Sequence, residues 1–142
     1  MPYVPAALKR AVIDRARNRC EYCLLHLDDV EFPHEIDHLV PVIHGGETVI
    51  DNLSLACLKC NRRKGTNLVA IDPVDRGVVL LFNPRQQVWR EHFKIVGAYL
   101  IGLTATGRAT TALLMLNDET RIERRLALID AGRYPPEGTE SA

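Results

Sequence analysis

The sequence predicts an α+β fold in which four cysteines hold a small core together and a C-terminal extension follows. Cys20 and Cys23 form one C-x-x-C pair, Cys57 and Cys60 form a second, and 33 residues separate the pairs. Short apolar segments of strand length occur together with longer segments that repeat at helical spacing. The hydrophobic content of 46% is sufficient for a packed core, and no apolar run is long enough to span a membrane.

Residues 5–18 are predicted to form an N-terminal helix. Pro5 suits a first helical turn, and one face carries the apolar residues Leu8, Ala11, Val12 and Ala16. The first cysteine pair follows this helix. A polar, acidic loop is then expected over residues 27–34.

The segment between and around the cysteine pairs is predicted to contain a bent strand and a short helix. Residues 35–43 are expected to form the first strand of a hairpin, bent at Pro41. Residues 52–58 are expected to form a helical turn, and residues 59–66 a helix that ends at Gly65. Ile71-Asp72-Pro73 marks a boundary, so we expect domains over residues 1–72 and 73–142.

The C-terminal extension is predicted to contain β-structure followed by two helices. Residues 78–82 are expected to form a buried strand, and residues 93–103 one or two more around Gly97. An amphipathic helix is expected over residues 106–116. In the helix after it, Ile122, Leu126 and Ile129 are in register. We expect the extension to cover an apolar face of the core; the alternative is that Arg85, Arg90 and Arg108 extend a surface for DNA.

The two cysteine pairs indicate a zinc site. Each C-x-x-C pair forms a tight turn, and two such turns supply four thiolates to one tetrahedral Zn²⁺. Such a site has no open coordination position, so its role is structural. The alternatives are a redox C-x-x-C pair, four ordinary buried thiols, or disulfides. Disulfides are disfavoured because nothing that resembles a secretory signal precedes Cys20.

The catalytic candidates lie between and beside the cysteine pairs. His38 is a natural general base near neutral pH, and Asp37 points to the opposite side of an extended segment. Asn61 directly follows Cys60 and offers an amide oxygen suited to Mg²⁺ or Mn²⁺. Asn52 is expected in a loop from which its side chain can form a hydrogen bond with the backbone near His38. Taken singly, Asp37-His38 is compatible with a surface pair, and Asn52 with the cap of a helix that starts at Leu53.

Together these motifs make residues 20–65 resemble an HNH endonuclease domain, the ββα-metal nuclease fold. In that family a strand carries an acid and the histidine base, a loop carries an asparagine, and a helix carries the last ligand. Asp37-His38 matches the first motif, Ile50-Asp51-Asn52-Leu53 the second and Cys60-Asn61-Arg62-Arg63-Lys64 the third.

The resemblance implies a role for each matching residue. It implies that Asp37 and Asn61 bind a catalytic divalent metal, that His38 activates water and that Asn52 orients His38. It also implies that Cys20, Cys23, Cys57 and Cys60 bind a structural zinc. Asn61 stands where the family usually has its last histidine, a variant also seen in CRISPR effector nucleases, and it favours an oxygen-loving metal.

The C-terminal part carries a second resemblance, to a tail found on a group of small bacterial HNH proteins. The residues that carry it are Asn83-Pro84-Arg85, Trp89, His92-Phe93, Gly102-Leu103-Thr104 and Gly107-Arg108-Ala109. This resemblance implies no activity for the extension.

The expected partner is DNA. Arg62, Arg63 and Lys64 follow the last ligand and are predicted to contact phosphates, although a solvated helix face is the alternative. The chain has 18 basic and 18 acidic residues and a formal net charge of zero, so we expect weak, salt-sensitive binding.

The sequence thus predicts a metal-dependent DNA endonuclease with a structural Zn²⁺ and a catalytic Mg²⁺ or Mn²⁺. The alternative is a zinc-stabilised nucleic-acid-binding module without cleavage activity. A cytoplasmic protein is expected, with no membrane association. A monomer with one site would nick one strand and a homodimer could cut both, and the sequence does not choose between them.

Overall fold

The structure is a computed structural model that describes residues 3–139. The chain forms two compact units, which we describe separately. Of the described residues, 3–68 and 83–86 belong to unit 1, and 69–82 and 87–139 belong to unit 2. The helices and short two-stranded sheets confirm the predicted α+β class. The division into domains at residue 72 stays a prediction.

Unit 1 begins with helix α1, Ala6–Arg15, which packs on strand β2 (Leu53–Ala56). Val12 of α1 is fully buried and forms a core with Leu53 and Leu55. Ala11, expected on the same face, is exposed. The helix ends before the predicted residue 18 because Arg17 and Asn18 adopt positive φ angles of 54° and 65°.

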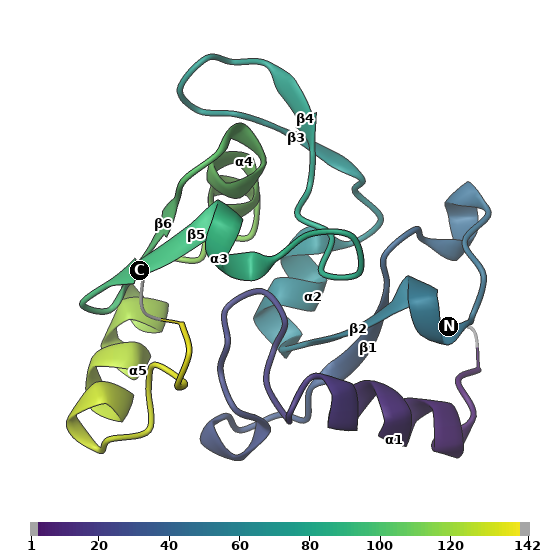
Figure 1. Ribbon diagram of the computed structural model, residues 1–142, viewed down its shortest axis with the longest axis horizontal. Coiled ribbons are helices and arrows are strands. Elements are labelled where there is room, and N and C mark those ends of the chain that lie inside the picture. Colours follow the sequence, from purple (N-terminus) through teal and green to yellow (C-terminus); the bar gives the residue numbers. More distant parts are fainter. Residues whose placement is uncertain (1–2, 140–142) are drawn as a thin grey trace. The chain divides into compact units, whose positions relative to one another are not determined.

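The central hairpin of unit 1 pairs strand β1, Glu35–His38, with β2 in antiparallel register (Figure 1). Asp37 lies opposite Ser54, and His38 lies opposite Leu53. The helical turn predicted over residues 52–58 is therefore wrong. All four residues of β2 are buried, and pairing with β1 satisfies part of their backbone groups, which outweighs the weak local preference of so short a segment. The outer edge of β2 bonds to other parts of unit 1: the Leu55 amide donates to Glu21 Oε2 at 2.8 Å, and the Leu55 carbonyl accepts from the Glu21 amide.

Helix α2, Leu58–Lys64, follows β2 and contacts both strands of the hairpin. The Cys57 side chain caps its first turn by accepting a hydrogen bond from the Cys60 amide, and the helix ends at Gly65 as predicted. Three short 3₁₀ helices complete the unit: Leu27–Asp29, Val42–His44 and Ile50–Asn52. The predicted strand over residues 35–43 therefore ends at His38 and turns into a loop.

Residues 83–86 join unit 1 through Arg85. Its guanidinium donates to the Leu53 carbonyl at 3.1 Å and forms an ion pair with Glu21. Arg15 from α1 donates to the same carbonyl and to that of Ile50. The Arg85 side chain therefore makes contacts within unit 1, although the sequence also allowed it to contact DNA.

Unit 2 contains two hairpins, β3 (Val69–Ile71) with β4 (Val78–Leu80) and β5 (Phe93–Val96) with β6 (Tyr99–Gly102). The turn at Gly97 is as predicted, with a positive φ of 60°. Strand β3 was not predicted. The expected burial of residues 78–82 is correct for Leu81 and Phe82, but Val78 and Leu80 are each 67% exposed.

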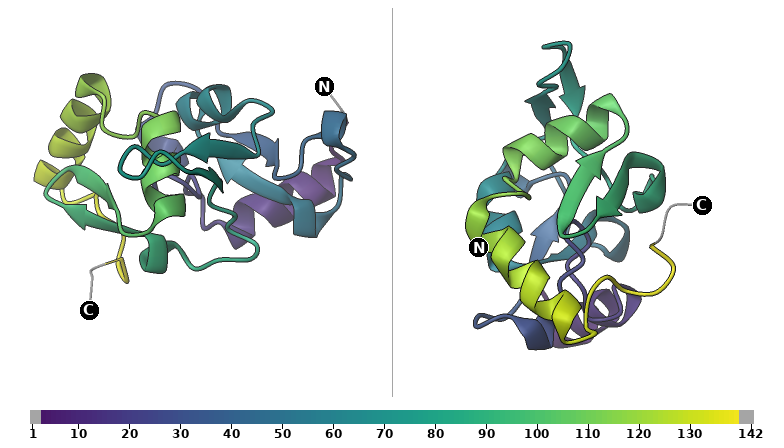
Figure 2. Two further views of the ribbon diagram at one scale, coloured as in Figure 1. Left: turned by 90° about the horizontal axis from the view of Figure 1, so that it is seen from above. Right: turned by 90° about the vertical axis from the view of Figure 1, so that its left-hand side faces the viewer.

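The helices of unit 2 are α3 (Trp89–His92), α4 (Ala105–Leu113) and α5 (Glu119–Asp130). Figure 2 shows α4 beside the β3–β4 hairpin, and α4 also packs on β6. Arg108 of α4 binds Asp72 through two hydrogen bonds of 2.9 and 2.7 Å. This ion pair lowers the pKa of the Asp72 carboxyl to about 2 and occupies a second arginine that the sequence allowed for DNA.

Helix α5 only partly buries the apolar face that its spacing predicts, since Ile122 and Ile129 are partly buried. Leu126 is 52% exposed, whereas Arg121 and Arg125 are buried. Arg125 donates to the carbonyls of Ala98 at 2.6 Å and Leu116 at 2.7 Å, so the guanidinium satisfies backbone groups that would otherwise lack partners. Of the helices that the structure describes, none combines the length and the apolar character needed to cross a membrane.

Candidate active site

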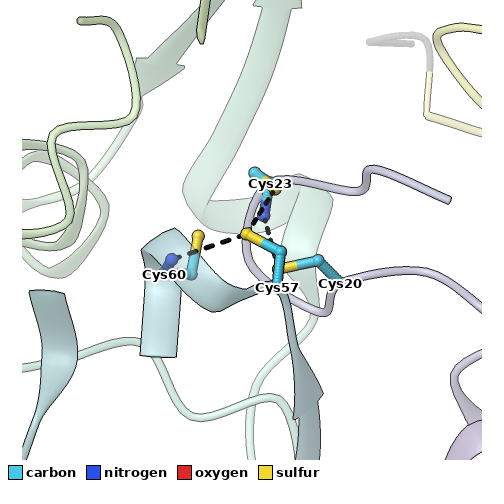
Figure 3. A group of neighbouring side chains, drawn as sticks. All are labelled: Cys20, Cys23, Cys57 and Cys60. Atoms are coloured by element: carbon cyan, nitrogen blue, oxygen red, sulfur yellow. Dashed lines mark hydrogen bonds between the residues drawn. The ribbon is translucent and has the colours of Figure 1, made fainter. Parts of the chain in front are cut away.

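The four cysteines converge at the junction of the 20–23 turn and the start of α2 (Figure 3). All are buried, and their sulfur atoms lie within 4.8 Å of one another. The Cys23 and Cys57 sulfurs are 3.7 Å apart. This separation is far longer than a disulfide bond, and it matches the edge of about 3.8 Å that four Zn–S bonds of about 2.3 Å give a tetrahedron.

Backbone amides donate hydrogen bonds to one sulfur atom in each cysteine pair. The Cys23 amide donates to the Cys20 sulfur at 3.5 Å, and the Cys60 amide donates to the Cys57 sulfur at 3.4 Å. Burial raises the pKa of the Cys20 and Cys60 thiols well above its ordinary value. Thiolates in such a place need a cation to compensate their charge, so the donor set fits the zinc site that the spacing predicts.

Strand β1 places Asp37 and His38 on opposite faces, as their adjacency predicts. Asp37 is 5% exposed and its Oδ2 accepts a hydrogen bond of 3.2 Å from the Tyr22 hydroxyl. His38 is partly exposed, and its Nε2 lies 2.9 Å from the Thr48 hydroxyl oxygen. The histidine ring is therefore held by a residue of the loop that follows β1.

Asn52 closes that loop from its far end. Its amide oxygen accepts from the Val40 amide at 2.9 Å, and its amide nitrogen donates to the carbonyls of Val40 at 3.0 Å and Glu47 at 2.9 Å. Asn52 thus anchors backbone two residues beyond His38, while Thr48 contacts the ring. The alternative in which Asn52 caps a helix does not apply, because Leu53 begins a strand.

Helix α2 directs its polar residues to different places. The Asn61 amide nitrogen donates to Glu35 Oε2 at 3.1 Å. Arg62 and Arg63 are exposed. Lys64, expected with them at a DNA surface, is only 2% exposed and pairs with Asp37 at 3.1 Å. Lys64 is buried because it is the last residue of α2, and this helix contacts β1.

Asp37, His38 and Asn61 line one cavity of about 380 Å³ in unit 1. Its other walls are formed by Ile36, Pro41, Val42, Ile43, Gly65 and Thr66. A carboxylate and an amide are the oxygen donors that Mg²⁺ and Mn²⁺ prefer, so the residues of this cavity fit such an ion.

The electrostatics of the cavity centre on Asp37. Burial raises the pKa of the Asp37 carboxyl, and the neighbouring Lys64 ammonium opposes that rise. Burial also raises the pKa of the Tyr22 hydroxyl well above its ordinary value, and the adjacent Asp37 adds to that rise. Tyr22 therefore remains protonated and donates its hydrogen bond to the carboxylate.

Three residues of this site were missed by the sequence reasoning: Tyr22, Glu35 and Thr48. A signal existed for Glu35, because residues two apart in a strand share a face and Glu35 is two residues before Asp37. Nothing in the spacing of Tyr22 or Thr48 indicates their partners. Tyr22 lies 15 residues from Asp37 and Thr48 lies 10 residues from His38, so only folding brings them together.

Comparison with known proteins agrees with this geometry. The sequence model of the HNH endonuclease family matches residues 20–67. The chain is also similar to the Septu protein PtuB of Bacillus thuringiensis, with 28% identity over 123 residues, or 85% of this chain. The chain spans 44% of the length of that relative. No solved structure matches the chain significantly.

The matched segment begins at the first zinc-site cysteine and ends three residues after Lys64, so it includes the cysteine cluster, the β1–β2 hairpin and α2. Of these elements, β1 and α2 line the cavity, through Asp37 and His38 from β1 and Asn61 from α2. Residues 20–67 of this chain are therefore similar to the HNH endonuclease domain whose sequence model they match.

Proposed function

We propose that the protein is a metal-dependent DNA endonuclease that hydrolyses phosphodiester bonds in the cavity of unit 1. The observation that carries the proposal is that Asp37, His38 and Asn61 come from two elements, β1 and α2, and line the same cavity. The proposed base is thus combined with two oxygen donors for a hard cation.

His38 is the proposed general base. The Thr48 hydroxyl oxygen lies 2.9 Å from Nε2 and can accept its proton. In that tautomer Nδ1 keeps its lone pair and takes a proton from the water that attacks the phosphorus. Asn52 contributes by anchoring the backbone at Val40, which fixes the loop that carries Thr48.

Asp37 and Asn61 would hold the divalent cation. When bound, Mg²⁺ or Mn²⁺ neutralises charge on the scissile phosphate and on the leaving oxygen. Glu35 acts on Asn61: it accepts a hydrogen bond of 3.1 Å from the amide nitrogen, which leaves the amide oxygen for the cation. Tyr22 holds the Asp37 carboxylate from its buried side.

Arg62 and Arg63 are the proposed phosphate contacts. Both are exposed on α2, which also carries Asn61. Because the formal net charge of the chain is zero, affinity for DNA depends on such local cations, and we expect it to fall as salt rises. The four-cysteine site has the structural role, since four thiolates leave zinc no open position for substrate.

Cleavage of supercoiled plasmid with Mg²⁺ or Mn²⁺ tests the function. We expect the native protein to cut, and His38→Ala to lower the rate constant about 10²- to 10⁴-fold, the range for loss of a general base. His44→Ala is the matched control, because His44 is exposed on the 3₁₀ turn that follows the same strand. It should cut at nearly the native rate.

Zinc content and circular dichroism must first show that all three proteins are equally folded. If the native protein binds DNA but cuts under no divalent metal, the proposal fails in favour of a zinc-stabilised binding module. If His38→Ala cuts as fast as the native protein, cleavage does not use His38 as its base.

A further inference from the structure

The side chain of Lys64 is directed into unit 1, in contrast to the two arginines before it. Its Nζ lies 3.1 Å from Oδ2 and 3.4 Å from Oδ1 of Asp37. It also donates to the His38 carbonyl at 3.3 Å. The side chains of Lys64 and Asp37 are only 3% and 6% exposed. An ammonium group therefore contacts both oxygens of the proposed metal ligand.

The charges of this pair oppose the binding of a second cation. Asp37 and Lys64 together are neutral, so a divalent ion that bound Asp37 beside the ammonium would share one negative charge with it. Like charges repel strongly where water is largely excluded. The lysine stem has four flexible carbons, so the ammonium can withdraw, but a buried charge that leaves its partner must find another or reach water.

We propose that Lys64 is a built-in competitor for the divalent metal: its ammonium neutralises Asp37 in the metal-free protein, and the ion binds only as the ammonium withdraws. The proposal rests on the proposed function through the assignment of Asp37 as a metal ligand. It gives Lys64 a role in the occupancy of the metal site, which differs from the phosphate contact that its position in the sequence suggests.

Binding of Mn²⁺ to the zinc-loaded full chain tests the competition. The signal of free aqueous Mn²⁺ in electron paramagnetic resonance gives the dissociation constant without any cleavage reaction. We expect Lys64→Met, which keeps the stem and removes the charge, to bind Mn²⁺ about tenfold more tightly than the native chain or better, within the usual range for coupled sites. Lys59→Met removes the same charge from an exposed position of α2 and should change the constant less than about twofold.

Asp37→Asn identifies the group for which the two cations compete. In this background Lys64→Met should no longer tighten Mn²⁺ binding, because the shared carboxylate is gone. The proposal is overturned if Lys64→Met binds Mn²⁺ no more tightly than the native chain, or if its gain persists in Asp37→Asn. Absence of Mn²⁺ binding to the native chain and to Lys64→Met also overturns it.

A second measurement needs no variant, which matters because Lys64→Met leaves a buried carboxylate unpaired. Acetylation of the native chain, followed by mass spectrometry of the peptide that contains Lys64, reports the accessibility of its amine. We expect slow labelling without Mg²⁺ and labelling several-fold faster with saturating Mg²⁺, while the rate at Lys59 stays constant. An unchanged rate at Lys64 contradicts the proposal. Failure of the proposed function is a separate result, since it appears as absence of DNA cleavage.

Discussion

At the scale of single residues, the candidate site depends on side chains that hold other side chains. His38 is held by Thr48, Asn61 by Glu35, and Asp37 by Tyr22 and Lys64. Each contact restricts the orientation of a group proposed to act on water or to bind metal. A site whose acting groups are already oriented avoids the cost of ordering them when substrate binds.

Thr48 offers a test of this arrangement. Thr48→Val keeps the shape of the side chain but removes the oxygen that lies 2.9 Å from His38 Nε2. We expect kcat for DNA cleavage to fall roughly 10- to 100-fold, the range seen when a supporting hydrogen bond at a metal site is removed, with little change in KM. Steady-state kinetics on a nicking substrate measures both constants.

Thr48→Ser is the matched variant, because it restores a hydroxyl at the same atom. It should recover most of kcat. Equal losses in Thr48→Ser and Thr48→Val would contradict the prediction, because a hydroxyl at this position would then not restore kcat.

At the scale of elements, the loop between β1 and β2 determines where Thr48 lies. The side chain of Asn52 closes the loop on Val40, and Gly46 packs against the same point. A Cβ on Gly46 would lie 1.7 Å from the Val40 carbonyl oxygen and 2.9 Å from Nδ2 of Asn52. Glycine is therefore required there for space.

Gly46→Ala should consequently destabilise unit 1, by about 2–3 kcal/mol, because backbone atoms must move. Gly45→Ala is the control: its φ is +87°, but nothing lies within 4 Å of the added Cβ, so only the conformational cost of roughly 1 kcal/mol applies. Urea unfolding of the zinc-loaded proteins, monitored by circular dichroism, compares the two. Equal stability losses would contradict the close packing of Gly46 against Val40.

The elements also show where prediction from sequence succeeds. Residues 58–64, 105–113 and 119–130 are helical near the predicted positions, because caps and turn residues such as Cys57, Thr104 and Asp118 act locally. The local sequence predicts a helical turn in place of strand β2, because the strand forms only by pairing with β1, whose paired residues lie 15 to 21 positions earlier in the chain. The apolar spacing in α5 predicts its buried face only in part, because two arginines fill the most buried positions and donate to backbone carbonyls.

At the scale of the whole molecule, the cysteine cluster is the proposed link between distant parts of unit 1. It joins the turn after α1 to the start of α2, and these segments are separated by 33 residues. The free energy of zinc binding to such sites is about 10–16 kcal/mol. That is as large as the whole stability of a typical domain, about 5–15 kcal/mol.

Removal of zinc should therefore unfold unit 1. We expect one zinc per chain by atomic absorption, and loss of the cooperative thermal transition of this unit after treatment with a strong chelator. Readdition of Zn²⁺ should restore the transition, whereas Mg²⁺ should not, because thiolates select the softer ion. Following the thermal transition through the nuclear magnetic resonance signals of unit 1 amides makes the measurement specific to this unit. An unchanged transition in chelated protein would show that the cysteines pack without metal.

The sequence by itself indicates a zinc site through its cysteine spacing, contains the adjacent acid and histidine, and predicts most helix positions. Each of these depends on local chemistry or short-range spacing. The tertiary structure alone decided that residues 53–56 form a strand, that Thr48 holds His38, and that Lys64 is buried against Asp37 and directed away from solvent. The physical reason is that hydrogen bonds and ion pairs between residues 10 to 27 positions apart form only when the chain has folded, and no pattern of nearby residues specifies them.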